Sequence, residues 1–313
     1  MIKTKQRGEF YSFLLYDLSL LVLFFCLNVF FEVKMDIISQ VLRSIHFDAS
    51  IYLHSQFCSP WGLNSDNPGL SSFHVIAFGN CNIALEHKPT IHLNAGDLIF
   101  FPKNLSHKIY NPDASAEIST TLICGSFDFS QLNNPIIDSL PDFIHIKANE
   151  IAQYPWFESL FRQIVNEAES GTEGRSIILD KLAEILFIYI LRYYVLISQH
   201  SNGLFAGLAD PHISKALMAF HSDMASLWTV ERLAQYALMS RSAFSDKFSS
   251  LVQLSPMQYV TFWRMQSALN ALKSSQDSIL TIALNHGYQS EAAFSKVFKK
   301  HFSITPGKAR KVT

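Results

Sequence analysis

Cysteine is scarce in this chain of 313 residues and follows no recognisable pattern. The four copies, Cys26, Cys58, Cys81 and Cys124, are far apart and form no CxxC pair. The sequence therefore suggests neither a structural zinc site nor a disulfide framework. We expect reduced thiols, which is the usual state of cysteine in the cytosol.

A strong net charge is also missing, since the formal value is only −1. That average hides an uneven distribution, because residues 210–313 carry 12 Lys and Arg against 6 Asp and Glu, whereas residues 1–209 carry 13 against 20. An acidic surface repels phosphates, so the C-terminal third has the charge that a nucleic acid-binding surface needs. A basic excess is also common on solvated faces, so it identifies DNA binding only together with a motif.

One apolar run near the N-terminus has several explanations. Residues 18–31, "LSLLVLFFCLNVFF", follow basic residues as in a signal peptide, but no small-x-small cleavage site comes after them. Counted from Phe13 the run has about 20 residues, enough for a membrane anchor. The positive-inside rule would then export the rest of the chain, away from DNA.

We favour a third explanation, in which residues 1–34 are upstream sequence included by an early start codon. Met35 begins "MDIISQVLRSI", an amphipathic pattern typical of a helix at the start of a domain. N-terminal sequencing of the natively expressed protein would contradict this hypothesis by finding residues before Met35.

A short pattern occurs twice in the C-terminal third, at an offset of 50 residues. "SRSAFSDKFSSLVQLSP" begins at Ser240 and "SEAAFSKVFKKHFSITP" begins at Ser290. In each copy a serine able to cap a helix precedes apolar residues at helical spacing, and a proline follows. Another helical pattern lies just upstream of each copy, "TVERLAQYALMS" and "SILTIALNHGYQS". The sequence therefore predicts two helix-turn-helix units joined by a helix.

Residues 213–310 resemble the AraC/XylS family of bacterial transcription regulators. "IALNHGYQSEAAFSKVFKKHFSITPGKAR" is close to the signature of that family. The resemblance implies an all-α DNA-binding domain over residues 211–313, with double-stranded DNA and RNA polymerase as partners. It also implies a homodimer that acts in the cytoplasm.

The second helix of each unit is expected to enter the major groove with its outward N-terminal residues. These outward residues are Arg241, Ser242, Ser245, Asp246 and Ser249 in the first unit and Glu291, Ala292, Ser295, Lys296 and Lys299 in the second. By family position, the candidates for base contact are Ser242, Ser245, Asp246, Ala292, Ser295 and Lys296. We expect phosphate contacts from Arg241, Lys247, Arg264, Lys299 and Lys300. Asp246 could accept a hydrogen bond from a cytosine amino group, so the first unit is expected to add discrimination and the second to add affinity.

Residues 71–129 show alternating apolar patterns punctuated by Gly, Asn and Pro, which predict short strands in a small barrel or jelly roll. "GDLIFFPKNLSHKIYN" resembles a motif of the cupin sensor domain found in one AraC subgroup, which implies a cupin-like domain over residues 35–150. The fold class is therefore α+β and multidomain. Metal-binding cupins use a His-x-His pair and a Glu, and only His74 stands in that region, so we expect no metal and no other cofactor.

The effector is not named by any pattern. One possibility is a small molecule in the barrel, in a pocket lined by some of Trp61, His74, Phe100, His107 and Cys124. Another is an oxidant that acts through Cys58, Cys81 or Cys124. A cupin metalloenzyme fused to a nucleic acid-binding module is the alternative function, although it would need the missing metal ligands. We predict that the protein is not an enzyme.

Residues 151–199 return to helical spacing, and the segment from Ile185 to Ile197 is apolar nearly all round. Such a helix is either buried wholly within its own domain or covered by a second subunit in a homodimer. The small and polar residues at 200–210 are expected to form an interdomain linker.

Overall fold

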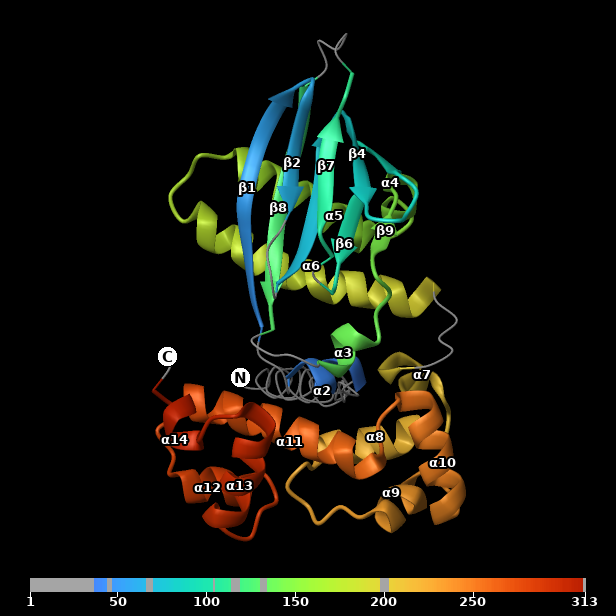
Figure 1. The fold of residues 1–313 in the computed structure, drawn as a ribbon, viewed down its shortest axis with the longest axis vertical. Helices are drawn as coiled ribbons and strands as arrows, with labels where there is room; N and C mark the ends of the chain where they lie inside the picture. The colour runs from blue at the N-terminus through green and yellow to red at the C-terminus, as the bar shows by residue number, and fades with distance from the viewer. Residues whose placement is uncertain are drawn as a thin grey trace, which may run out of the picture.

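The computed structural model describes residues 37–43, 47–65, 70–103, 105–113, 119–129, 134–197 and 203–311. The apolar segment 18–31 and the candidate start at Met35 lie outside the described residues. None of the described helices is both long and apolar enough to cross a membrane. Figure 1 shows a domain of β-strands and helices on one side of the molecule and an all-helical domain on the other.

The N-terminal domain is built from two antiparallel sheets. One sheet has the strand order β1-β8-β3-β6-β9 and the other the order β2-β7-β4-β5. The strands are β1 (Asp48–Cys58), β2 (Trp61–Ser65), β3 (Ser71–Phe78), β4 (Asn80–Leu85), β5 (Ile91–Asn94), β6 (Leu98–Phe101), β7 (His107–Asn111), β8 (Ser119–Asp128) and β9 (Ile144–Ile146). The predicted cupin-like architecture is confirmed.

Strands β3 and β6 of the five-stranded sheet are buried on both faces, which explains their almost continuous apolar sequences. In β3, Ile76 belongs to the cluster between the two sheets, whereas Phe73 and Val75 belong to the cluster on the outer face. Because side chains alternate along a strand, His74 points inward with Ile76.

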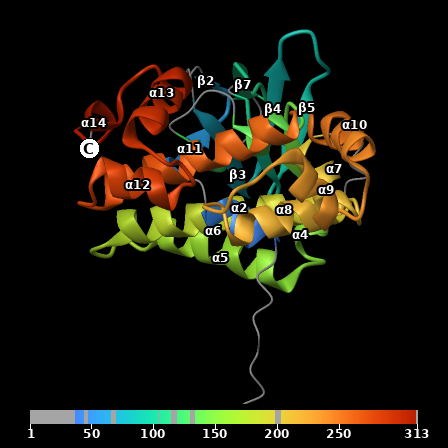
Figure 2. The same cartoon turned by 90° about the horizontal axis from the view of Figure 1, so that it is seen from below.

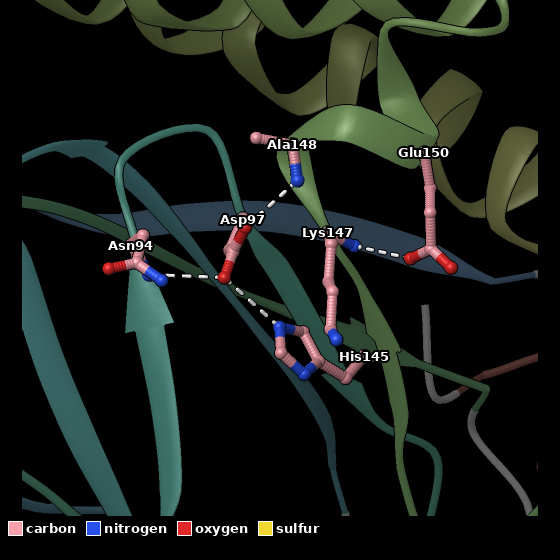
Figure 3. A network of polar contacts seen from close by, with 6 residues as sticks. All are labelled: Asn94, Asp97, His145, Lys147, Ala148 and Glu150. Atoms are coloured by element: carbon pink, nitrogen blue, oxygen red, sulfur yellow. Dashed lines mark hydrogen bonds and ion pairs between the residues drawn. The ribbon is translucent and has the colours of Figure 1, made fainter.

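The side chain of Asp97 connects the barrel to the segment that follows it, at residues 145–148. The Asp97 carboxylate accepts hydrogen bonds from the backbone N–H of Asn94 (3.0 Å) and of Ala148 (2.8 Å), and it lies 3.1 Å from Nε2 of His145 (Figure 3). Gly96 has a φ of 88°, and a Cβ there would lie 2.7 Å from the Cβ of Ala148. The turn before β6 therefore needs a glycine both for its backbone conformation and for the close approach of helix α4 (Ala148–Ile151).

Two helices, α5 (Pro155–Glu169) and α6 (Arg175–Ile197), cover the outer face of the five-stranded sheet. Phe187 of α6 packs among Phe100, Phe127 and Phe129 of the sheet, with ring centroids 5.0 to 6.0 Å apart. The opposite side of α6 leaves Ile178, Ile185 and Leu196 exposed. The helix that is apolar all round is thus half covered by its own domain.

The C-terminal domain contains two helix-turn-helix units. The first unit comprises α8 (Ile213–Ser222), α9 (Val230–Tyr236) and α10 (Arg241–Val252), and the second comprises α12 (Ile279–Asn285), α13 (Glu291–Phe302) and α14 (Pro306–Ala309). Helix α11 (Pro256–Ser274) joins them, and Figure 2 shows it running from one unit to the other.

The serines expected to begin the second helices do so. Ser240 Oγ accepts from the N–H of Ala243 (3.3 Å), and Ser290 Oγ accepts from the N–H of Ala293 (3.2 Å). The turns between the paired helices differ in length, because the N-caps of α9 and α10 are Thr229 and Ser240 whereas those of α12 and α13 are Ser278 and Ser290. The second turn is therefore one residue longer.

The segment expected to be a flexible linker contains a helix instead. Helix α7 (Leu204–Ala209) buries Leu204 and Phe205 in a core shared by the barrel and the first helix-turn-helix unit. The N–H of Leu204 donates to Ser139 Oγ (2.7 Å), in the loop after α3 (Pro135–Asp138). Short helix α2 (Ile37–Arg43) packs on α8 of the same unit. Residues 204–209 of the expected linker at 200–210 thus form a packed helix, because its apolar side chains find a tertiary partner that local composition does not show.

Candidate nucleic acid interface and sensor site

Helices α10 and α13 present the same surface pattern. Phe244 and Phe248 in α10, and Phe294 and Phe298 in α13, are fully buried against their own units. The expected base-contact and outward positions lie on the opposite side of each helix. Of these, Arg241, Ser242, Asp246, Glu291, Ala292, Lys296 and Lys299 are exposed, and Ser245 and Ser295 are half-buried. Each unit thus offers an exposed face at the start of its second helix, as a groove-reading helix requires.

The two faces differ in free positive charge. In the first unit Nε of Arg241 lies 2.8 Å from Oε1 of Glu231, and Nζ of Lys247 lies 2.6 Å from Oδ2 of Asp210. Partial burial acts to raise the pKa of Asp210, but the Lys247 ammonium and the N–H groups of His212 and Ile213 lower it overall. Both expected phosphate-binding cations of this unit are therefore paired with carboxylates.

In the second unit, Lys296, Lys299 and Lys300 make no ion pair with any residue that the structure describes. Lys300 lies apart from the other two, because it lines a cavity between the two domains together with Val297 and His301. This cavity has a volume of about 1140 Å³ and reaches Leu140 of the N-terminal domain. No sequence pattern indicates this cavity, because its lining residues are distant along the chain.

Arg264 is not a phosphate-binding residue in this structure, contrary to the prediction. Its side chain, in the middle of α11, is turned inward and the residue is only 8% exposed. Nε donates to the carbonyl of Met224 (2.9 Å) and Nη2 donates to the carbonyl of Ser226 (2.6 Å). Burial lowers the pKa of the guanidinium. The helical spacing of residues in α11 could not indicate that the Arg264 side chain is buried.

Inside the barrel, three of the expected pocket residues form one hydrogen-bonded line. Nδ1 of His107 lies 2.6 Å from the Leu105 carbonyl, which can only accept, so this nitrogen carries a proton. Nε2 of a neutral His107 then accepts from Nε2–H of His74 (2.7 Å), and Nδ1 of His74 accepts from the Cys124 thiol (3.0 Å). Every hydrogen bond in this line can therefore form while both histidines and the thiol are neutral.

The electrostatics agree with this neutral line. Burial, followed by the neighbouring His107, lowers the pKa of His74 well below its ordinary value. Burial, followed by Cys81, raises the pKa of the Cys124 thiol. The His74 imidazole faces its two partners through different ring nitrogens, so the three groups do not converge on one point. Among the described residues, no group of three or more His, Cys, Asp or Glu side chains is arranged to hold a metal ion.

The other two expected pocket residues, Phe100 and Trp61, lie on different sides of the five-stranded sheet. Phe100 faces Phe187 of α6 on the outer side of the sheet, so its assignment to a pocket inside the barrel is wrong. Trp61 stacks on Phe57 with ring centroids 4.7 Å apart, and its Nε1 donates to Oγ1 of Thr120 (3.3 Å). Trp61 packs against the same inner cluster as Cys124.

Comparisons with known families cover both domains. A family model described as "Cupin" matches residues 36–196, and one described as "Helix-turn-helix domain" matches residues 233–312.

Full-length relatives are similar over almost the whole chain. An uncharacterized HTH-type transcriptional regulator of Haemophilus influenzae is 31% identical over 300 residues, which are 88% of this chain and 99% of that protein. The HTH-type transcriptional regulator AlkR of Acinetobacter baylyi is 28% identical over 299 residues, 87% of this chain and 98% of AlkR. The RCS-specific HTH-type transcriptional activator RclR of Escherichia coli is 24% identical over 279 residues, 88% of this chain and 97% of RclR.

Proposed function

This chain belongs to the AraC family of DNA-binding transcription regulators with an N-terminal cupin domain, and we propose that both of its helix-turn-helix units read one operator. The observation that carries this proposal is the repeated pattern of α10 and α13, in which buried phenylalanines fix each helix and the opposite face is left exposed. Two recognition helices in one chain require two half-motifs about one helical turn, or roughly 34 Å, apart.

We assign base contacts to Ser242, Ser245 and Asp246 of α10 and to Ala292, Ser295 and Lys296 of α13. The unpaired lysines of the second unit supply the larger share of phosphate attraction, whereas the ion pairs of Arg241 and Lys247 reduce it in the first unit. Asp246 adds discrimination, since a carboxylate accepts from cytosine N4 but is repelled by phosphate.

Selection of binding sites from random DNA by the full chain tests this proposal. We expect enriched sequences with two half-motifs at a fixed spacing. Asp246→Ala should relax the preference within one half-motif, and Lys296→Ala should affect the other. Ser250→Ala is the matched control, because Ser250 is exposed on α10 and its hydroxyl donates to the Lys247 carbonyl of the same helix. If only one half-motif is enriched, and if Asp246→Ala or Lys296→Ala leaves its sequence preference unchanged, then the two units do not both read the operator.

We further propose that the effector is a small molecule received by the barrel interior. A thiol sensor needs a lowered pKa, whereas burial raises the pKa of Cys124 and raises that of Cys81 to about 12. The neutral line of His74, His107 and Cys124 instead offers groups that can exchange hydrogen bonds with a polar ligand. The oxidant alternative remains testable, because Cys124→Ala should abolish an oxidant response in a reporter assay if that thiol is the sensor. Cys58→Ala, which removes the exposed thiol among the three candidates, tests the same alternative at that position.

The remaining parts of the proposal concern assembly and place of action. The exposed apolar side of α6 supports a homodimer, since a self-complementary stripe on one helix suits a two-fold interface. Contact with RNA polymerase is proposed from the family alone. We propose that the protein acts in the cytoplasm, because its target is chromosomal DNA. The lack of converging metal ligands among the described residues of the barrel supports regulation rather than metal-dependent catalysis.

A further inference from the structure

The two helix-turn-helix units do not share a hydrophobic core. The core of the first unit includes Val260, Phe262 and Trp263 of α11, and the core of the second begins with Met265 and Ala268 of the same helix. Arg264 stands between the two sets. The relative orientation of the units therefore depends on α11 itself and on the polar contacts made at this boundary.

The guanidinium of Arg264 bridges parts of both units. It donates to the Met224 and Ser226 carbonyls in the loop between α8 and α9, and its Cζ lies 6.0 Å from the ring centroid of Tyr288, in the turn between α12 and α13. No carboxylate among the described residues lies within ion-pair distance of it. A buried cation is costly unless its donors are satisfied, so these carbonyls hold the side chain in one position.

Gly287 leaves the space that the guanidinium needs. A Cβ at this position would collide with Nη2 of Arg264 and would lie 2.7 Å from the carbonyl oxygen of Ala225. Backbone conformation alone does not demand a glycine at this point of a helix-turn-helix. The corresponding turn of the first unit holds Leu238, which has a φ of 56° against 76° at Gly287, and its side chain is 73% exposed. At Gly287, the space that a Cβ would take is filled by the Arg264 guanidinium.

We propose that Arg264 and Gly287 act as a positioning clamp that fixes the angle between α10 and α13 and so sets the half-motif spacing that the protein accepts. Successive base pairs turn around the DNA axis, with about 10 to 10.5 base pairs per turn, so a changed angle between recognition helices favours a changed spacing. This inference rests on the proposed reading of one operator by both units. The inference names the residues that make operator binding selective for the spacing between the half-motifs as well as for their sequence.

The test is a selection from DNA libraries in which the two preferred half-motifs are separated by every spacing within one helical turn. Wild type, Arg264→Met and Arg264→Lys are compared as full chains. We expect one dominant spacing for wild type, and for Arg264→Met the same half-motif sequences spread over several neighbouring spacings. Affinity for the best-spaced site should fall about tenfold if only about a tenth of the molecules then hold the orientation that fits it. Affinity for a single half-motif should stay unchanged.

Gly287→Ala tests the second residue of the clamp. It displaces the guanidinium without removing it, so it should also alter the spacing profile, whereas Leu238→Ala at the equivalent turn should not. A wild-type profile in both Arg264→Met and Gly287→Ala would overturn the inference. Circular dichroism confirms that each variant is folded, and Arg264→Lys provides a charged variant if Arg264→Met unfolds. If the wild type itself shows no paired half-motifs, the proposed function fails first, which separates the two failures.

Discussion

At the residue scale, basic side chains have different environments on neighbouring helices. Lys299 of α13 is exposed and free of ion pairs among the described residues, Lys247 of α10 is paired with Asp210, and Arg264 of α11 is buried. Sequence spacing could place Lys299 on an outward face because helical period determines the face. It could not reveal the other two arrangements, because Asp210 and the Met224 and Ser226 carbonyls come from separate segments.

Replacing Lys299 by Ala should weaken binding to all DNA sequences to a similar extent. A lost phosphate contact removes about one released counterion, so the slope of log K against log salt should fall by about 1. Titration at several salt concentrations measures this slope. Lys181→Ala, which removes an exposed lysine of α6, is the control and should leave it unchanged. A loss limited to one operator sequence would instead assign Lys299 to base contact.

Replacing Phe298 by Ala should destabilise the second unit by about 3 to 5 kcal/mol, because the ring is fully buried and leaves a cavity. Hydrogen exchange monitored by mass spectrometry locates the effect. Since the second unit has its own core, exchange should rise over residues 279–309 and stay unchanged in α8 to α10. Equal loss of protection in both units would show that they unfold together.

His221 should make stability depend on pH. Burial lowers its pKa to about 3, so the folded chain holds it neutral, with Nε2 2.6 Å from the Tyr259 hydroxyl. The unfolded chain binds the proton at its ordinary pKa of about 6.5, so stability is present above that pH and is lost as pH falls towards 3. His221→Gln should flatten the decline in the free energy of unfolding between pH 6.5 and the acid limit. Denaturant titrations of both proteins across this range measure the difference.

At the scale of whole elements, the sequence was informative where a local pattern determines the outcome. Serine caps, helical phenylalanine spacing and alternating strand residues predicted both helix-turn-helix units and the barrel. Helix α7 was missed because its burial depends on the loop after α3 and on the barrel. Phe100 was misplaced because a strand buried on both faces shows no apolar alternation to reveal which residues point inward.

Helix α6 gives a prediction about assembly. If its exposed apolar side forms the homodimer interface, Ile185→Arg should place a charge in that interface and shift the protein to monomers. Sedimentation velocity over a range of concentrations detects the shift. Gln163→Arg, an exposed substitution on α5, should leave the assembly state unchanged. An unchanged dimer in the Ile185 variant would place the interface elsewhere.

At the scale of the molecule, the two DNA-binding units are unequally connected to the sensor domain. The first unit shares one continuous core with the barrel, α6 and α7, and Asp210 after α7 pairs with Lys247 of α10. Helix α7 packs directly on α10, so a displacement of α7 would be expected to move α10. The second unit meets the rest of the helical domain through α11, Arg264 and the packing of Phe262 against His301.

The separate core that begins at Met265 makes the C-terminal end of the chain an exchangeable part. Its buried residues contact one another and not the barrel, so a chimaera could take residues 265–313 from a relative and keep its own sensor and first unit. Such a chimaera should recognise a hybrid operator, with one half-motif from each parent, while still responding to the original inducer. The junction would have to preserve Arg264 and the glycine opposite it. Within this family, operators could then diverge one half at a time without any change in the signal that is sensed.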